Sequence, residues 1–316
     1  MEMKKKWKFI DLFAGIGGFH IAFSRVGAEC VFASEWDKYA RISYENYFKK
    51  HNPQLFESNN FAGDITKVDE TIIPDFNILT GGFPCQPFSQ AGKKKGFEEI
   101  RGTLFFDIVR IINEKQPEAF FIENVRHLFA HDGGKTFKAI KDVIELELGY
   151  SFHYSIMKAS DFGLPTFRPR LFMVGFRDKN VPFDFPKPIE LTLTMSDILG
   201  GVCEKKIGYT LRVGGKSSGI HDRRNWDTYL VDNLVHKITV DEAKRLMGFP
   251  DDFKFDKVSS TQAMKQLGNS VAINAIQATA QKVIEALNNY YGNAQQSDKR
   301  EQRGMERVLH SAQTTL

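Results

Sequence analysis

The chain has 316 residues, a formal net charge of +4 and 26% charged side chains, a length that can bury a full core and hold one large domain with a smaller companion. No apolar run approaches the ~18 residues of a membrane-spanning helix, and Lys8 and Asp11 interrupt the short apolar segment after the basic start, which argues against a signal peptide. The three cysteines are widely spaced and the histidines lack ligand spacing, so we expect neither disulfides nor metal, and a reducing cytoplasm.

The first half alternates β-rich runs with helical stretches. Strands are expected at 7–12, 29–33, 61–64, 76–80, 118–122, 151–158 and 171–176. Helices are expected at 19–25, 38–48, 104–113 and 137–148. Strands that alternate with helices predict an α/β fold with a doubly wound, mostly parallel sheet.

The composition changes after Arg177. Prolines at 182, 186 and 188 and glycine pairs at 200–201 and 214–215 predict a small, loop-rich module over 181–255. Helical patterning returns at 240–247 and 273–288, so residues 256–291 are expected to rejoin the first domain, 1–180. The polar segment 292–316 is expected to be disordered, with a short helix over 301–309 as the alternative.

A cysteine between two prolines follows one predicted strand, in Gly-Gly-Phe-Pro-Cys-Gln-Pro from residue 81. Prolines fix φ and remove a backbone donor, so Cys85 is expected on a stiffened loop. Another predicted strand ends on Glu123, followed by Asn124 and Val125. Because neighbouring parallel strands end at one crevice, a thiol and a carboxyl group would meet there. A small buried hydrophobe is the alternative for a lone cysteine.

A glycine-rich turn, Phe-Ala-Gly-Ile-Gly-Gly-Phe over 13–19, follows a predicted strand and opens a helix, as nucleotide-binding turns do. It is not the dinucleotide fingerprint, because His20 takes the third glycine position, and a purely structural turn remains the alternative. Glu35 ends the second strand, where an acid accepts from ribose hydroxyls. Trp36 offers a stacking face, and Asp64 can accept from an adenine amino group.

Together with Leu-Gly-Asn-Ser-Val at 267–271, these segments resemble the DNA (cytosine-5)-methyltransferases from about Phe9 to Ala286. The resemblance implies a Rossmann-like methyltransferase domain over 1–180 and a small, loop-rich β target-recognition domain over 181–255. It also implies S-adenosyl-L-methionine as cofactor, double-stranded DNA as substrate and a bacterial restriction-modification setting. A restriction endonuclease would then belong to the same system without binding the enzyme, which is expected to be a monomer. The implied cofactor-binding residues are Phe13, Ala14, Gly15, Gly17, Gly18, Glu35, Trp36, Asp64, Ile65, Pro84, Asn269 and Ser270.

In the chemistry that the resemblance implies, Cys85 adds to C6 of a flipped-out cytosine, and Glu123 donates to N3 with a pKa raised by burial. Arg168 and Arg170 alternate along an extended segment, so they are expected to point to one side, near the flipped base. A surface charge is the alternative for one of them. Thr166 stands where the family usually has Gln, which puts that contact in doubt.

DNA contacts are expected from two regions. Residues 86–102 resemble a mobile loop whose Lys93, Lys94 and Arg101 reach phosphates, a solvated basic loop being the alternative. Polar residues of the module are expected at base edges, namely Thr210, Arg212, Arg223, Arg224 and Asn225. A non-catalytic relative and an RNA methyltransferase remain rival readings, while the glycine spacing disfavours a nicotinamide oxidoreductase.

Overall fold

The computed structural model describes residues 6–84, 103–213 and 219–292. Its centre is a seven-stranded sheet with the order β3-β2-β1-β4-β5-β7-β6. The strands are β1 (Lys8–Leu12), β2 (Glu29–Ser34), β3 (Phe61–Ala62), β4 (Ile78–Gly82), β5 (Ala119–Val125), β6 (His153–Lys158) and β7 (Pro169–Phe176). Strands β1 to β5 pair in parallel, whereas β7 runs antiparallel to both β5 and β6. The mostly parallel α/β sheet predicted from the sequence is confirmed.

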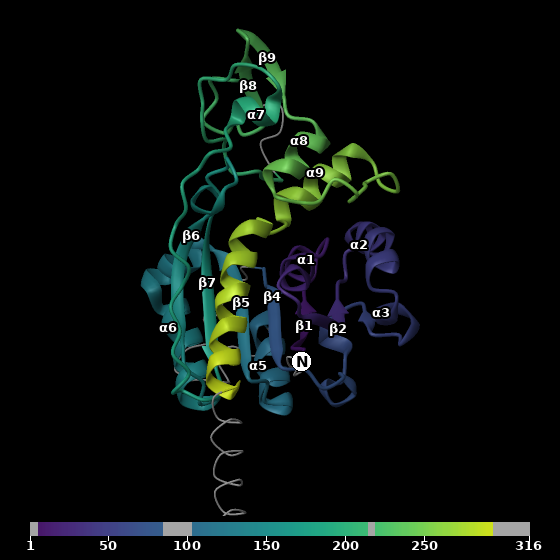
Figure 1. Ribbon diagram of the computed structural model, residues 1–316, viewed down its shortest axis with the longest axis vertical. Coiled ribbons are helices and arrows are strands. Elements are labelled where there is room, and N and C mark those ends of the chain that lie inside the picture. The colour runs from purple at the N-terminus through teal and green to yellow at the C-terminus, as the bar shows by residue number, and fades with distance from the viewer. Residues whose placement is uncertain (1–5, 85–102, 214–218, 293–316) are drawn as a thin grey trace, which may run out of the picture.

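Helices cover both faces of this sheet (Figure 1). Along β5, Phe121 belongs to one core cluster, and Phe120 and Ile122 belong to the other, as the two-residue period of a strand requires. The first cluster contains α1 (Gly18–Arg25), α2 (Lys38–His51) and the helical residues 273–292. The second contains α5 (Leu104–Lys115) and α6 (Lys135–Asp142). The doubly wound arrangement is therefore present.

A small two-stranded sheet lies apart from the large one, at the top of Figure 1. It consists of β8 (Thr228–Val231) and β9 (Leu234–Lys237), which pair antiparallel. Asp232 and Asn233 join them with φ values of 50° and 63°, the left-handed conformation that a tight hairpin turn needs. In the chain, helix α7 (Met195–Leu199) precedes this small sheet, and helices α8 (Val240–Leu246) and α9 (Ser260–Asn269) follow it.

Several short elements differ from the sequence prediction. The helix expected over 137–148 ends as α6 at Asp142 and continues as a π-helical turn, Val143–Glu147. Helix α9 was not predicted, whereas the β structure of the small module was expected from the resemblance, without bounds for β8 and β9. The remaining short helices are α3 (Gln54–Glu57), η1 (Ile65–Lys67), η2 (Glu70–Ile72), η3 (Arg126–Gly134) and η5 (Ala159–Phe162). Within the ranges that the structure describes, no helix is long and apolar enough to cross a membrane.

Candidate active site

The carboxyl ends of β1, β2, β4 and β5 place the predicted site residues at one edge of the sheet. Leu12 pairs with Gly81, so the glycine turn leaves β1 beside the end of β4. Gly82 pairs with Glu123, so the chain that leaves β4 starts beside this carboxyl group. The two motifs that the sequence suggested would meet are therefore on adjacent strands. Cys85 itself lies outside the described residues.

The glycine turn is held by backbone hydrogen bonds and by packing. The N–H of Gly17 donates to the Ala14 carbonyl at 2.7 Å, and the N–H of Ala14 donates to the Ser34 carbonyl at 2.9 Å. Gly17 has a φ of 83°, and a Cβ there would lie 2.2 Å from the Phe48 ring. Packing therefore requires glycine at position 17, which agrees with the alternative that this part of the turn is purely structural.

Glu35 closes the turn from the end of β2. One carboxylate oxygen accepts from the N–H of Gly15 and the other from the N–H of Asp37, both at 2.7 Å. Burial raises the pKa of Glu35, and the two backbone donors oppose that shift. The neighbouring Trp36 is 78% exposed, an unusual position for an indole ring. A fixed acceptor thus stands next to an open stacking surface.

The C-terminal part of the chain returns to the glycine turn. A Cβ added to Gly18 would lie 2.5 Å from Cγ2 of Val271 and 3.3 Å from Oγ of Ser270. Ser270 is buried, whereas Asn269 at the end of α9 is exposed. The structure therefore brings together the two glycine-containing motifs that are farthest apart in the sequence.

Asp64 begins a third segment of the site, after β3. Its Oδ1 accepts from the backbone N–H of Thr66 at 3.1 Å and from the Thr66 hydroxyl at 2.8 Å. The hydroxyl contact and then the backbone contact hold the pKa of Asp64 below its usual range. The carboxylate is therefore ionised and able to accept from a ligand amino group. Ile65, which follows, is buried.

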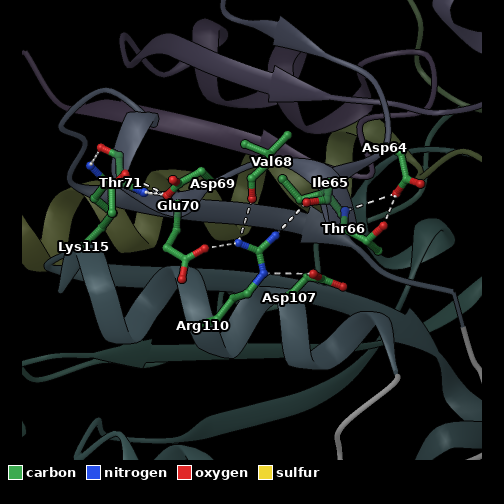
Figure 2. Close-up of polar contacts among 10 residues, drawn as sticks. All are labelled: Asp64, Ile65, Thr66, Val68, Asp69, Glu70, Thr71, Asp107, Arg110 and Lys115. Carbon is green, nitrogen blue, oxygen red and sulfur yellow. Dashed lines mark hydrogen bonds and ion pairs between the residues drawn. The ribbon is translucent and has the colours of Figure 1, made fainter.

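Arg110 of α5 holds this segment in place, as Figure 2 shows. Its guanidinium donates to the carbonyls of Ile65 at 2.6 Å and Val68 at 2.9 Å. It also bonds the carboxylates of Glu70 and Asp107. A planar fork with several donors suits such a set of acceptors better than an ammonium group does. Sequence reasoning missed Arg110, because nothing local to α5 indicates which distant carbonyls it meets.

Glu123 and Arg170 form a buried ion pair. Arg170 Nε lies 2.8 Å from Glu123 Oε1, and both side chains are largely shielded from solvent. Burial raises the pKa of Glu123 and outweighs the opposing charges of Arg170 and Arg168. A Cβ on Gly82 would lie only 3.0 Å from Glu123 Oε2, so the absent side chain leaves room for this carboxyl group.

Asn124 links Glu123 to the chain that leads to Cys85. Its side-chain amide donates to the Phe83 carbonyl at 2.8 Å, and its side-chain oxygen Oδ1 accepts from the N–H of Val125. The exposed Pro84 follows Phe83 directly. The sequence signal for Asn124 was its place in the Glu-Asn-Val triplet, but no role for it was predicted.

Arg168 has partners different from those of Arg170. It is 1% exposed and donates to the carbonyls of Leu211 at 3.0 Å, Gly268 at 2.9 Å and Ser270. Its charge still reaches Glu123, so the two arginines lie near each other as their alternation predicts. The contact of Arg168 with a substrate base stays a prediction, and its hydrogen bonds favour a role in holding the backbone.

The predicted DNA-reading residues of the module fall into two groups. Arg212, Arg223 and Arg224 are exposed, and Arg224 Nη2 lies 2.7 Å from Asp222 Oδ2. Thr210 is partly buried. Lys93, Lys94 and Arg101 lie outside the part of the chain that the structure describes.

Asn225 is a correction to the sequence prediction. It is 5% exposed, its amide donates to the Thr228 carbonyl at 2.8 Å, and its carbonyl oxygen accepts from the Thr228 N–H at 3.1 Å. These bonds turn the side chain into the module, so it cannot reach a base edge in this conformation. In residues 6–84, 103–213 and 219–292, no group of three or more His, Cys, Asp or Glu is arranged to hold a metal ion.

Comparison with known sequences places these features in a family. The family described as C-5 cytosine-specific DNA methylase matches residues 7–223 and 204–285. Type II methyltransferase M.HhaI of Haemophilus parahaemolyticus is 41% identical over 322 aligned residues, covering 89% of this chain and 95% of that protein. Type II methyltransferase M.SsoII of Shigella sonnei is 44% identical, covering 89% of this chain and 81% of that protein.

Solved structures share the fold at lower sequence identity. A mutant of DNMT2 from Spodoptera frugiperda matches with a TM-score of 0.66 and 18% identity, covering 89% of this chain and 99% of that chain. The Dnmt2 methyltransferase of S. pombe matches with a TM-score of 0.63 and 19% identity, covering 90% of this chain and 100% of that chain.

Proposed function

This chain belongs to the C-5 cytosine-specific DNA methylase family, and on that premise we propose how its own residues carry out the reaction. It transfers a methyl group from S-adenosylmethionine to C5 of cytosine in DNA. We propose that the target is a cytosine flipped out of a specific duplex sequence and that Cys85 bonds covalently to its C6. The type II relatives support a further proposal, protection of host DNA in a restriction-modification system.

The cofactor residues proposed from the sequence fit S-adenosylmethionine. Glu35 is a fixed, buried acceptor for ribose hydroxyls, and the exposed Trp36 offers a surface for the adenine ring. The ionised Asp64 can accept from the adenine amino group. Ser270, which lies close to Gly18, would contact the methionine end of the cofactor. When bound, this cofactor supplies an electrophilic methyl group on a sulfonium centre.

Cys85 would supply the nucleophile. Cytosine C5 is a weak nucleophile, and addition of the Cys85 thiolate to C6 would convert the ring to an enamine that is nucleophilic at C5. Loss of the C5 proton then expels the thiolate and restores the aromatic ring. Support comes from the position of Cys85 in the chain, directly after Pro84, where the backbone leaves β4 beside Glu123.

The observation that carries the proposal is the buried Glu123 carboxyl at the ends of β4 and β5. Burial raises the pKa of Glu123, so this carboxyl group takes up a proton more readily than an exposed glutamate does, and once protonated it can donate to N3 as negative charge develops on the ring. Arg170 orients the carboxyl group through the 2.8 Å ion pair and adds a fixed positive charge close to it. Asn124 holds the Phe83 carbonyl and so fixes the start of the Cys85 segment against Glu123.

Sequence choice is assigned to the module over 181–255, with 1–180 and 256–291 forming the catalytic and cofactor-binding part. The exposed Arg212, Arg223 and Arg224 support this division, because guanidinium groups make bidentate contacts to guanine edges. The positively charged segment with Lys93, Lys94 and Arg101 is proposed to contact phosphates.

The test is covalent trapping. Wild-type protein with S-adenosylmethionine and duplex DNA containing 5-fluorocytosine should form a complex that survives denaturing electrophoresis, because fluorine does not leave as a proton does. Cys85→Ser should form none and lose methyl transfer, while it retains cofactor binding by calorimetry. Methyl transfer to tRNA in place of DNA, or turnover in Cys85→Ser, would refute the proposal. Cys203→Ser, a change at a buried cysteine of the module, is the matched control.

A further inference from the structure

A short parallel contact joins the start of β7 to the module. Thr166 and Gly208 form an isolated parallel bridge. The Gly208 N–H donates to the Pro165 carbonyl at 2.8 Å, and its carbonyl accepts from the Phe167 N–H at 3.0 Å. The Thr166 hydroxyl donates to the Tyr209 carbonyl at 2.9 Å. Thr166, where a Gln was expected from the resemblance, thus has a defined partner in the module.

Arg168 extends this contact to a third segment. One of its amino groups donates to Leu211 in the module, and the other donates to Gly268 and Ser270 at the end of α9. The guanidinium is buried, and among the described residues its Nε has no hydrogen-bond partner. A buried charge that is held by carbonyls depends on their geometry, since an unsatisfied donor at this depth is costly. Arg168 therefore couples the position of Leu211 to that of Ser270.

Gly268 makes the same coupling from the other side. A Cβ at this position would lie 3.0 Å from the Arg212 carbonyl carbon, 3.1 Å from its oxygen and 3.3 Å from the Val213 nitrogen. Gly268 is in helix α9 and is not among the described positive-φ glycines, so space and not conformation requires glycine. The atoms it meets are backbone, which cannot rotate away. The reading segment with Arg212 therefore rests directly on α9.

We propose that Arg168 and Gly268 form a junction that sets the position of the reading segment relative to Glu123, and that Arg168 is a positioning residue for sequence choice. The inference rests on the proposed reading role of the module. A shift of residues 211–213 moves the Arg212 backbone while the cofactor turn keeps its own contacts. The junction thus determines which base edges the module meets when a cytosine occupies the pocket beside Glu123.

Gly268→Ala is the sharpest test, because alanine favours the helix whereas the close contact with the backbone of Arg212 and Val213 opposes it. Gly219→Ala is the matched control, since a Cβ there meets nothing within 4 Å. Bisulfite sequencing gives the ratio of methylation at the preferred sequence to that at single-base variants. We expect this ratio to fall about tenfold in Gly268→Ala and to stay unchanged in Gly219→Ala. The KM for S-adenosylmethionine should change less than about twofold in both.

Arg168→Lys provides a second, independent change, because it keeps the charge and loses the fork that spans the carbonyls. We expect it to lower discrimination as Gly268→Ala does, with a smaller loss in cofactor affinity than in discrimination. Unchanged discrimination in both variants, or parallel loss of cofactor binding and folding in both, would overturn the inference. Arg212→Ala distinguishes a failure of the proposed reading role from a failure of the junction. If this variant leaves the methylated sequence unaltered, the reading role of Arg212 is refuted, and the junction role that rests on it is refuted as well.

Discussion

At the scale of single residues, burial raises the pKa of Glu123 and lowers that of His20, because it disfavours the charged form of each. Glu123→Gln keeps a hydrogen-bond donor but cannot release or take up a proton. We expect kcat to fall by roughly 10²–10⁴-fold with little change in the KM for cofactor. Single-turnover rates would measure this, with the exposed Glu57→Gln as control.

The pH dependence of the same variant follows from the direction of the shift. A raised pKa keeps Glu123 protonated to higher pH than an ordinary glutamate, so its contribution to the rate is lost as pH rises through that pKa. Glu123→Gln should lack this alkaline limb and keep the opposing limb, along which the rate rises as the Cys85 thiol ionises. Identical pH profiles for the two proteins would remove Glu123 from proton transfer.

His20 bears on the stability of the fold. Burial lowers its pKa from 6.5 to about 3, and its neutral ring lies 2.6 Å from the Tyr44 hydroxyl and stacks on Phe48. Below pH 6.5 the unfolded chain binds a proton that the folded protein excludes, so stability falls as pH falls. Because of His20, we expect the free energy of unfolding to fall by about 1.4 kcal/mol for each unit by which the pH drops below 6.5, down to about 3. Urea unfolding of His20→Phe should show a shallower pH slope, and an equal slope would contradict this.

At the scale of elements, α5 supports through Arg110 the segment after β3 that is proposed to bind the cofactor (Figure 2). Arg110→Lys keeps the charge but cannot serve the Ile65 and Val68 carbonyls together. We expect the KM for S-adenosylmethionine to rise about tenfold, the cost of one or two charge-assisted hydrogen bonds, with kcat at saturation and sequence choice unchanged. Initial-rate kinetics and calorimetry would measure it.

Lys115→Met on the same helix is the control for this element, because its amino group makes one exposed bond to the Thr71 carbonyl at 3.0 Å. It should leave the KM for cofactor close to normal. A normal KM in Arg110→Lys would show that the segment with Asp64 keeps its position without the guanidinium.

At the scale of the whole molecule, chemistry and sequence reading are assigned to different parts of the chain. Alanine at Arg212, Arg223 and Arg224 should relax the methylated sequence by about 1–3 kcal/mol for each lost bidentate contact, without changing cofactor affinity. Alanine at Lys93 and Lys94 should instead weaken binding to all DNA and reduce its salt dependence. Bisulfite sequencing and binding titrations at several salt concentrations distinguish the two effects.

Asn225→Ala is the control for the module. Its bonds to Thr228 are internal, so its loss should lower the melting temperature without relaxing the methylated sequence. Relaxed sequence choice in this variant at an unchanged melting temperature would return Asn225 to the reading set.

The sequence by itself was sufficient for a mostly parallel sheet and for the order of its main strands along the chain, whereas the order of the strands within the sheet came from the structure. Strand period, helix period and glycine-rich turns are local, so residue type and spacing report them directly. The rule that neighbouring parallel strands end at one crevice led us to expect the chain after residue 80 close to Glu123, and the pairing of Gly82 with Glu123 agrees with that expectation. The proposed role of Cys85 as nucleophile followed from the resemblance to the methyltransferases, and that resemblance rests on several motifs in a fixed order.

Tertiary structure decided the partners of side chains that look alike in the sequence. Arg168 and Arg170 are two positions apart, yet one meets the backbone of Leu211 and Gly268 and the other a carboxyl group. Asn225 is buried beside the exposed Arg224. These differences arise from the packing of segments that are distant in the chain. The partners are often backbone carbonyls, which every residue has, so residue type does not reveal them. Position 268 likewise needs glycine because the Arg212 backbone lies against it, and the spacing of residues in the sequence does not predict that contact.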